Sequence, residues 1–208
     1  MPIAWNQDPP GSEAQIAANA AAVLGDIAAD APARTVPTLA MAQEWHRRLY
    51  DGVQVPVHYY AGEFRDSDTS YPELYGYEVQ VGPFPGVPSA DVPQSLAHFE
   101  QQVQAAVAQL DAAIPPGAVP QPSEIGSVLV LCANVHGEWI RIHPFANGNG
   151  RTARLWANWA ALRYELPPFV TIKPRPGNPY GAAAMQSMTG NHQAMVAAFV
   201  QMLSAHLR

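Results

Sequence analysis

The chain has 208 residues, of which 48% are hydrophobic and 13% charged, a composition typical of one globular domain rather than of a disordered chain. No apolar run approaches the roughly 20 residues that a membrane-spanning helix needs. The N-terminus also lacks a signal-peptide pattern, so we expect a cytoplasmic protein with no membrane partner. Its single cysteine, Cys132, excludes an intrachain disulfide and a cysteine-based zinc site, and its apolar neighbours predict a buried thiol.

The net charge of −6 is unevenly distributed. Between Arg141 and Arg175, six basic residues and one acidic residue, Glu165, give a local charge of +5, which leaves −11 for the remainder. A basic island in an acidic chain suits a small anionic ligand such as a nucleotide. A nucleic-acid surface would need a broader basic stripe, so no nucleic-acid partner is expected. Taken alone, the charge is explained better by a solvated face.

The first half of the chain predicts two helices and a strand. Residues 1–11 are proline-rich and predict a loose tail, after which Ser12 and Gln15 form a capping-box pattern that opens an alanine-rich helix to about residue 29. A second helix is expected over 37–50 and a strand over 75–81, followed by turn signals at 82–83 and 85–86. The expected core side chains of the second helix are Leu39, Trp45, Leu49 and Tyr50.

The second half predicts further helices separated by proline-rich breaks. Apolar periodicity indicates helices over 93–113, from about 122 to 142, after residue 150, from Tyr180, and over 191–207. The expected core includes Leu96, Phe99, Val103, Val107, Leu110, Leu155, Trp156, Trp159, Ala160, Leu162, Met195, Phe199, Met202 and Leu203. The loop 166–179 holds Lys173, the only lysine, but no glycine-rich kinase loop precedes it and no Gly-Lys pair suggests a Walker loop. His136 is predicted to be a core or capping histidine, because spacing places no third ligand for zinc.

The stretch Ile142–Arg154 contains the side chains that suit chemistry. Pro144 disfavours helical geometry in the residue before it, so a helix is expected to end at His143. Gly148, Asn149 and Gly150 then supply a permissive backbone that a ligand can approach closely. A new helix is expected to follow, which makes this a helix-loop-helix unit.

The charges at the start of that new helix indicate an anionic ligand. Arg151 and Arg154 fall in the first turn, where the helix dipole disfavours cations. Loop amides and a helix N-terminus together make an anion site, and two arginines three residues apart share one face on which they can hold successive phosphates. His143 lies beside this cradle and suits proton abstraction. The pattern therefore predicts transfer of a phosphate-containing group to a hydroxyl; the simpler alternative is a structural turn with a buried histidine and two solvated arginines.

Residues 143–154 resemble the signature of the Fic family, H-P-F-x-[D/E]-G-N-G-R-x-x-R, and Gly62-Glu63-Phe64-Arg65 resembles the segment that leads into the flap of that family. The resemblance implies a mainly α Fic-type helical bundle with a β-hairpin flap, and transfer of AMP from ATP to a protein hydroxyl. It implies that His143 is the base and that Phe145 packs in the core. By the same resemblance, Gly148, Asn149 and Gly150 form an anion hole, while Arg151 and Arg154 hold the β- and γ-phosphates.

Asn147 departs from the signature. The family usually has an acidic residue here that holds the Mg²⁺ bridging the nucleotide phosphates, whereas an amide is a neutral and weaker ligand. Asn147 is therefore a doubtful metal ligand. Doc toxins, which are related phosphotransferases, also tend to have Asn at this position but usually replace the last loop glycine by lysine, whereas this chain keeps Gly150.

The sequence thus predicts an N-terminal tail and accessory helix over 1–34 and a Fic-type catalytic domain over 35–208. The expected reaction is protein adenylylation with ATP as co-substrate and Mg²⁺, on a Ser, Thr or Tyr hydroxyl of a protein substrate. The alternatives are a Doc-like phosphotransferase, a transferase of another nucleotide, and a catalytically weak nucleotide-binding module. Because the inhibitory pattern [S/T]-x-x-x-E-[G/N] is absent from plausible helical positions, any restraint is expected from a separate antitoxin-like protein; homodimerisation is left open.

Overall fold

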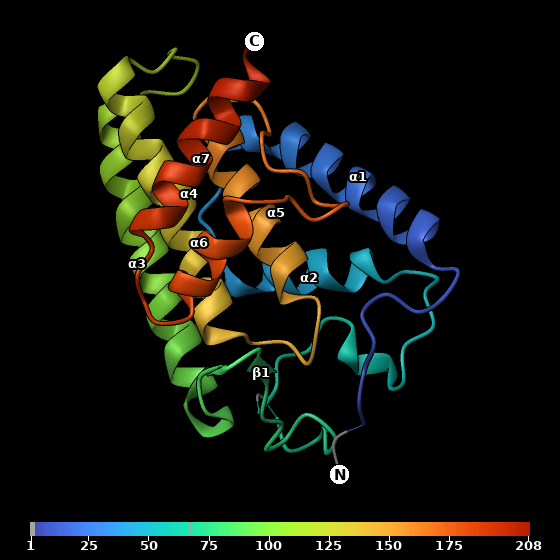
Figure 1. Ribbon diagram of the computed structural model, residues 1–208. Coiled ribbons are helices and arrows are strands. Elements are labelled where there is room, and N and C mark those ends of the chain that lie inside the picture. Colours follow the sequence, from blue (N-terminus) through green and yellow to red (C-terminus); the bar gives the residue numbers. More distant parts are fainter. Residues whose placement is uncertain (1–2, 67) are drawn as a thin grey trace.

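The computed structural model describes residues 3–66 and 68–208, which form a bundle of helices with one small hairpin (Figure 1). Its α-helices are α1 Glu13–Asp30, α2 Leu39–Leu49, α3 Val92–Ala113, α4 Pro122–Ile142, α5 Asn149–Arg163, α6 Tyr180–Ser187 and α7 Gln193–His206. Short 3₁₀ turns span Ala31–Ala33, His58–Tyr60 and Ser89–Asp91. The expected helices are all present with ends shifted by a few residues, and the mainly α fold is confirmed. Within 3–66 and 68–208, no helix combines the length and apolarity needed to cross a membrane.

Helices α4 and α5 form the centre of the bundle and make the most extensive pair contact in it. Helix α4 begins with a capping box, in which Gln121 and Glu124 each bond to the backbone of the other, and Pro122 occupies its first turn. On one side α4 packs against α3, α6 and α7, and on the other α5 packs against α1 and α2. This places the loop between α4 and α5 at the end of the bundle where the hairpin also lies (Figure 1).

Most of the expected core residues are buried, and the exceptions lie at its edge. Trp139 and Trp156 are among the largest fully buried side chains, and Cys132 is completely buried as expected. Four expected core residues are only half-buried and pack against the core from its edge: Leu39, Leu110, Leu162 and Met202. His136 is a buried core histidine that shares a hydrogen bond with the hydroxyl of Tyr180, and the described residues contain no group of three metal ligands.

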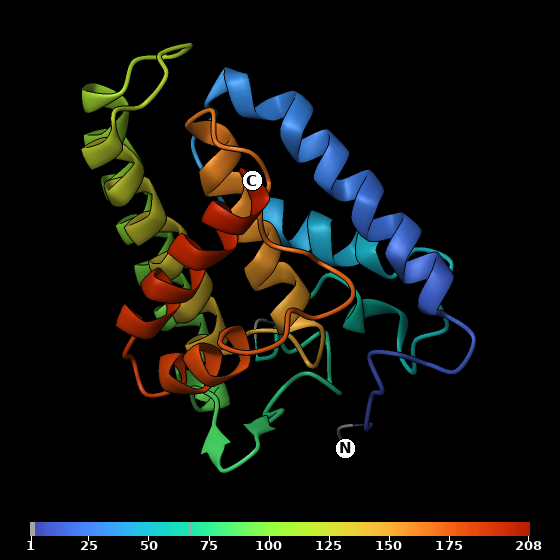
Figure 2. The ribbon, with the colours of Figure 1, turned by 45° about the horizontal axis from the view of Figure 1, so that its top comes forward.

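The N-terminal segment before α1 is not a loose tail, so this expectation was wrong for residues 3–8; residues 1–2 lie outside the described residues. Trp5 is only 6% exposed, and its ring centroid lies 4.6 Å from that of Tyr50. The backbone N–H of Ile3 also donates to the hydroxyl of Tyr60. Figure 2 shows this segment running from the N-terminus past the end of the bundle that carries the α4–α5 loop. A buried tryptophan contributes a large apolar contact area, which anchors a segment that has no periodicity of its own.

The hairpin is shorter than the sequence predicts. Strands β1 (Gln80–Val81) and β2 (Phe84–Pro85) pair antiparallel, with Gln80 opposite Pro85, and Gly82 takes a left-handed conformation in the turn. The expected strand over 75–81 was therefore wrong for residues 75–79. Residues 75 and 77 are instead held in turns, where the N–H of Tyr75 donates to the carbonyl of Tyr71 and the N–H of Tyr77 to that of Leu74. The carbonyl of Tyr77 also accepts from Arg65 rather than from a neighbouring strand.

Candidate active site

His143 lies at the C-terminal end of α4 in a left-handed conformation, with φ 55° and ψ 55°. Pro144 thus ends the helix as expected, but the residue before it adopts left-handed rather than extended geometry. The Nδ1 atom of His143 lies 3.0 Å from the carbonyl oxygen of Ile140, which can only accept, so Nδ1 must carry the proton. The Nε2 atom is left with the lone pair that a general base needs.

The surroundings of His143 keep its imidazole neutral. Burial, with a smaller contribution from the positive charge of Arg65, lowers the pKa of His143 to about 4 against the opposing effect of the Ile140 carbonyl. At neutral pH the side chain is therefore unprotonated, as a base must be before it accepts a proton.

Acidification is expected to unfold the protein through its buried histidines. Burial also lowers the pKa of His46 to about 3 and that of His136 well below its usual value. Because the unfolded chain binds protons near pH 6.5 and the folded chain does not, stability is complete above that pH and is lost as pH falls toward 4, by about 1.4 kcal/mol per pH unit for each such histidine. Urea unfolding between pH 7 and pH 4.5 measures this slope. It should become shallower in His143→Gln and stay unchanged in His98→Gln, whose side chain is exposed; equal slopes in all three proteins would contradict the assignment.

Arg65 connects the segment before the hairpin to the backbone beside His143. Its buried guanidinium donates to the carbonyls of His143 (2.7 Å), Ile142 (3.0 Å), Tyr77 (3.1 Å) and Val87. Burial lowers the pKa of Arg65 to about 10, so it remains protonated at neutral pH. The sequence placed Arg65 in a flap-like segment but gave no sign of these contacts, because they join residues far apart in the chain.

His46 of α2 holds the loop from the opposite side and was missed in the sequence. Its ring stacks on Phe145 at a centroid distance of 3.7 Å, and its Nε2 donates to the carbonyl of Asn147 at 2.9 Å. Asn149 closes the loop, because its side-chain amide donates to the carbonyl of Phe145 and accepts from the N–H of the same residue, both at 2.9 Å. Phe145 is fully buried. The side chain of Asn149 therefore stabilises the loop rather than facing a ligand.

Gly148 starts α5 in a position that only glycine fits. It has φ 79°, and a β-carbon there would lie 2.5 Å from the hydroxyl of Tyr50 and 2.7 Å from Nε2 of His46. The N–H of Gly148 is already bonded to the side chain of Asn147, so the anion-hole role expected for Gly148 has a competitor in the loop itself. Asn149 and Gly150 belong to the first turn of α5, and their N–H groups, unlike those of Arg151 and Thr152, which donate to the carbonyl of Gly148, suit an anion.

The two arginines of the signature are buried and point to different partners. Arg151, 4% exposed, donates to the hydroxyl of Tyr50, the carbonyl of Gln7 and the carboxylate of Asp8. Arg154, 5% exposed, directs Nε and Nη2 to the carbonyl of Ile172 and Nη1 to the hydroxyl of Tyr180. Neither arginine is solvated, and only Arg151 faces an anion. The clamp on successive phosphates that the spacing suggested therefore needs rearrangement of Arg154.

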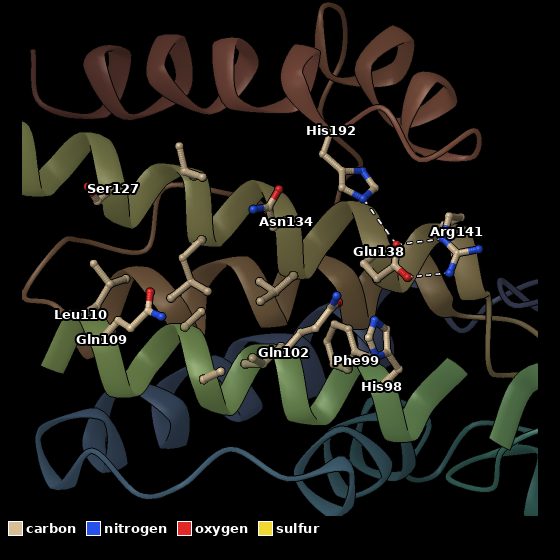
Figure 3. A pocket seen from close by; sticks show the side chains of 16 residues that line it. His98, Phe99, Gln102, Gln109, Leu110, Ser127, Asn134, Glu138, Arg141 and His192 are labelled. Atoms are coloured by element: carbon tan, nitrogen blue, oxygen red, sulfur yellow. Dashed lines mark hydrogen bonds and ion pairs between the residues drawn. The ribbon is translucent and has the colours of Figure 1, made fainter. Parts of the chain in front are cut away.

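A cavity of about 620 Å³ brings these groups together. His143, Asn147, Asn149, Gly150, Arg151 and Arg154 line it, together with Gln80–Gly82 of the hairpin, Lys173 and Arg175 of the loop after α5, and Tyr180. A larger hollow of about 880 Å³ lies between α3 and α4, where Glu138 pairs with Arg141 and His192 (Figure 3). None of the signature residues lines that hollow, so chemistry rather than size identifies the smaller cavity as the candidate active site.

The described residues do not form a Mg²⁺ site of their own. The Oδ1 of Asn147 accepts the N–H of Gly148, and its Nδ2 donates to the carbonyl of Trp5 at 2.7 Å, so the amide is engaged on both sides. Asp8 is the one carboxylate among the described residues lining the cavity, and it is bound to Arg151 and Lys173. A Mg²⁺ ion that arrives with a nucleotide would take its oxygen ligands chiefly from the phosphates.

Restoring the acidic residue should create a site that the wild type lacks. Asn147→Asp is expected to lower the Mg²⁺ concentration for half-maximal transfer about tenfold, because hard cations favour carboxylates over a neutral amide. Titration of Mg²⁺ at fixed ATP measures this, with Asn134→Asp as a control outside the candidate active site. An unchanged Mg²⁺ requirement would mean that position 147 does not approach the metal.

A model of the Fic/DOC family matches residues 37–161, which is more than half of the chain and includes the whole loop described above. The chain belongs to this family. At the level of fold, it is similar to a Fic domain containing signaling protein from Bacteroides thetaiotaomicron VPI-5482, with a TM-score of 0.61 and 18% identity over 90% of this chain and 65% of that one. It is also similar to BepC of Bartonella tribocorum with bound AMPPNP, with a TM-score of 0.59 and 16% identity over 95% of this chain and 88% of that one. The expected Fic-type bundle with a flap is thus confirmed.

One curated relative has a closer but much shorter match. A uridine 5'-monophosphate transferase of Xanthomonas campestris pv. campestris (strain 8004) is 50% identical over 38 residues, which are 18% of this chain and only 7% of that relative. The chain therefore matches a small fraction of the relative's length, and about two thirds of the Bacteroides protein. Membership of the Fic/DOC family together with this match supports a transferase.

Proposed function

We propose that this Fic protein transfers AMP from ATP to a hydroxyl side chain of a target protein. Nucleotidyl transfer as a class is supported by family membership and by the short match to a uridine 5'-monophosphate transferase. The single observation that carries the proposal is the state and position of His143. Its proton is fixed on Nδ1, its Nε2 is free, and it lines the same cavity as Arg151 and the first turn of α5. A neutral base beside an anion cradle suits attack by a hydroxyl on a phosphate.

The proposed reaction is a displacement at the α-phosphorus. Nε2 of His143 takes the proton of a Ser, Thr or Tyr hydroxyl while its oxygen bonds to the α-phosphorus, and the bond between that phosphorus and the oxygen bridging to the β-phosphate breaks. Pyrophosphate leaves with the electron pair of that bond. Arg151 and the first-turn amides of α5 bind the β- and γ-phosphates and stabilise the charge on the leaving group. Mg²⁺, when bound, would neutralise part of the phosphate charge.

The hairpin supports a protein substrate. Gln80, Val81 and Gly82 line the cavity beside His143, and a β-carbon on Gly86 would lie 3.1 Å from that of His143, so the flap closely approaches the base. A two-residue strand offers backbone groups to which an extended substrate segment can add as a further strand. Such docking holds a hydroxyl near the base while making few demands on the surrounding side chains.

Transfer of UMP is the second candidate, because the short sequence match is to a transferase of uridine 5'-monophosphate. The two candidates use the same base and the same phosphate cradle, so they differ only in the nucleoside that the cavity binds. The test incubates the purified protein with Mg²⁺, cell lysate and α-³²P-labelled ATP, UTP, GTP or CTP in separate reactions, with His143→Ala as control. Labelling from ATP that depends on His143 is expected; labelling from UTP alone would replace AMP by UMP, and labelling from none would contradict nucleotidyl transfer in favour of γ-phosphoryl transfer or of the binding module.

A further inference from the structure

The N-terminal segment places a carboxylate inside the candidate active site. Asp8 bonds to Arg151 Nη2 at 2.5 Å and to Nζ of Lys173, while the carbonyl of the preceding residue, Gln7, accepts from Nη1 of Arg151 at 3.1 Å. Arg151 and Lys173 have side chains only 5% and 19% exposed. Two cations held together in a cavity form an anion subsite, and the carboxylate is the anion that fills it.

The segment is held in place by more than this ion pair. Trp5 packs against Tyr50, His46 and Tyr60, and its carbonyl accepts from the side chain of Asn147. Residues 5, 7 and 8 thus all bind the α4–α5 loop or the first turn of α5: Trp5 binds Asn147, and Gln7 and Asp8 bind Arg151. Exposed ion pairs contribute little stability on their own, so the contacts of Trp5 and Gln7 help to hold Asp8 in place.

Lys173 extends the cradle beyond the signature. It is the only lysine of the chain and lies in the loop after α5, outside the signature residues 143–154. Its ammonium and the guanidinium of Arg151 meet at one oxygen of Asp8, Oδ1. A phosphate oxygen has the charge and the acceptor geometry to replace that oxygen.

We propose that Arg151 and Lys173 form a subsite for the terminal phosphate of a nucleoside triphosphate, and that Asp8 occupies this subsite until the nucleotide displaces it. The inference rests on the proposed function, since it concerns the nucleotide of that same site. Lys173 then acts as a phosphate ligand, and residues 3–8 act as an inhibitory segment that competes with the triphosphate for the subsite. The sequence led us to expect inhibition by a separate antitoxin-like protein, whereas the inhibitory group proposed here, Asp8, belongs to the same chain.

The charges around the subsite also favour displacement over metal binding. Burial acts to raise the pKa of Asp8, but the hydrogen bond and charge of Lys173 and the charge of Arg151 outweigh it, so the pKa of this carboxyl is lowered and it stays ionised at neutral pH. Oδ1 of this carboxylate already accepts from two cations, whose positive charges disfavour the approach of Mg²⁺. Removing it should therefore free the cations for phosphate rather than remove a metal ligand.

The test measures equilibrium binding of ATP, AMP and inorganic tripolyphosphate by calorimetry, using the full chain. Asp8→Asn is expected to tighten ATP and tripolyphosphate about tenfold, which is about 1.4 kcal/mol, and to change AMP less than twofold. Lys173→Met is expected to weaken ATP about tenfold and to abolish most of the gain from Asp8→Asn when the two are combined. Arg175→Met, which removes a charge from the same loop without touching Asp8, should leave that gain intact. Asp30→Asn at the far end of α1 controls for net charge.

The outcomes separate this inference from the proposed function. If Asp8→Asn leaves ATP binding unchanged or weakens it, competition between Asp8 and the triphosphate is refuted, whether or not the wild type transfers label from ATP. If the gain persists fully in the Lys173→Met background, Lys173 is not part of the subsite and the inference is wrong. If Asp8→Asn tightens ATP but neither protein transfers label to any target, the subsite stands and the transfer reaction is refuted. Thermal unfolding of each variant verifies that the fold is retained.

Discussion

His143→Ala is expected to slow nucleotidyl transfer by about 10²–10⁴-fold while leaving the affinity for ATP nearly unchanged. The loss follows from the proposed role of His143 as base, since the Ile140 carbonyl fixes the proton on Nδ1 and leaves the lone pair on Nε2. Affinity is retained because the phosphates are expected to bind Arg151, Lys173 and the α5 amides instead. Single-turnover transfer with α-labelled ATP gives the rate, and calorimetry gives the affinity.

The matched control for this variant is His98→Ala, which removes an exposed histidine of α3 far in sequence from the α4–α5 loop. It should transfer at the wild-type rate. Transfer by His143→Ala within tenfold of the wild type would remove His143 from the role of base. A parallel loss of ATP binding would instead show that the imidazole helps to bind the nucleotide.

Arg65→Met is expected to cost about 3 kcal/mol of unfolding free energy, because burying unpaired carbonyl groups is expensive. Four backbone carbonyls, from Tyr77, Val87, Ile142 and His143, lose their common donor. The carbonyls of Ile142 and His143 lie at the start of the α4–α5 loop, and the other two belong to the segment around the hairpin. Loss of Arg65 should therefore separate the flap from the base as well as destabilise the fold.

Urea unfolding measures the change in stability. The rate of transfer at saturating ATP measures the effect of separating the flap from His143. Arg65→Lys should lie between the wild type and Arg65→Met, since one ammonium retains the charge but cannot reach all four carbonyls in the same geometry. Arg47→Met is the control, because Arg47 is exposed on α2 and pairs only with a neighbouring surface residue, for a cost below about 0.5 kcal/mol. A loss in Arg65→Met no larger than in Arg47→Met would contradict the structural role.

The helices were predictable because their signals are local. Apolar periodicity and the break before Pro144 act within a few residues, so α3, α4 and α5 lie close to where the sequence places them. The loop that carries His143 and Arg151 was predictable for the same reason. Its glycines, basic residues and histidine are close together in the chain, and their combination is specific. The capping box expected from Ser12 and Gln15 was wrong, because the hydroxyl of Ser12 donates to the carbonyl of Pro9 and does not cap α1.

The features that the sequence did not predict depend on contacts between distant segments. His46 lies 101 residues before the carbonyl of Asn147 that it binds, and Arg65 lies 78 residues before His143. Nothing in an amphipathic helix such as α2 distinguishes a histidine that fixes a loop from one that fills the core. The position of Asp8 was not predictable for a related reason. A proline-rich segment without periodicity predicts a loose tail, and only the structure shows that its tryptophan is buried.

The central claim is that the hydroxyl attacks the α-phosphorus of ATP with His143 as base. The most direct test uses one reaction with ATP carrying ³²P at the α-position and ³³P at the γ-position, together with Mg²⁺, cell lysate and either wild type or His143→Ala. The account predicts that protein acquires ³²P without ³³P, and only with the wild type. Protein labelled with ³³P alone would show phosphoryl transfer from the γ-position and would contradict nucleotidyl transfer.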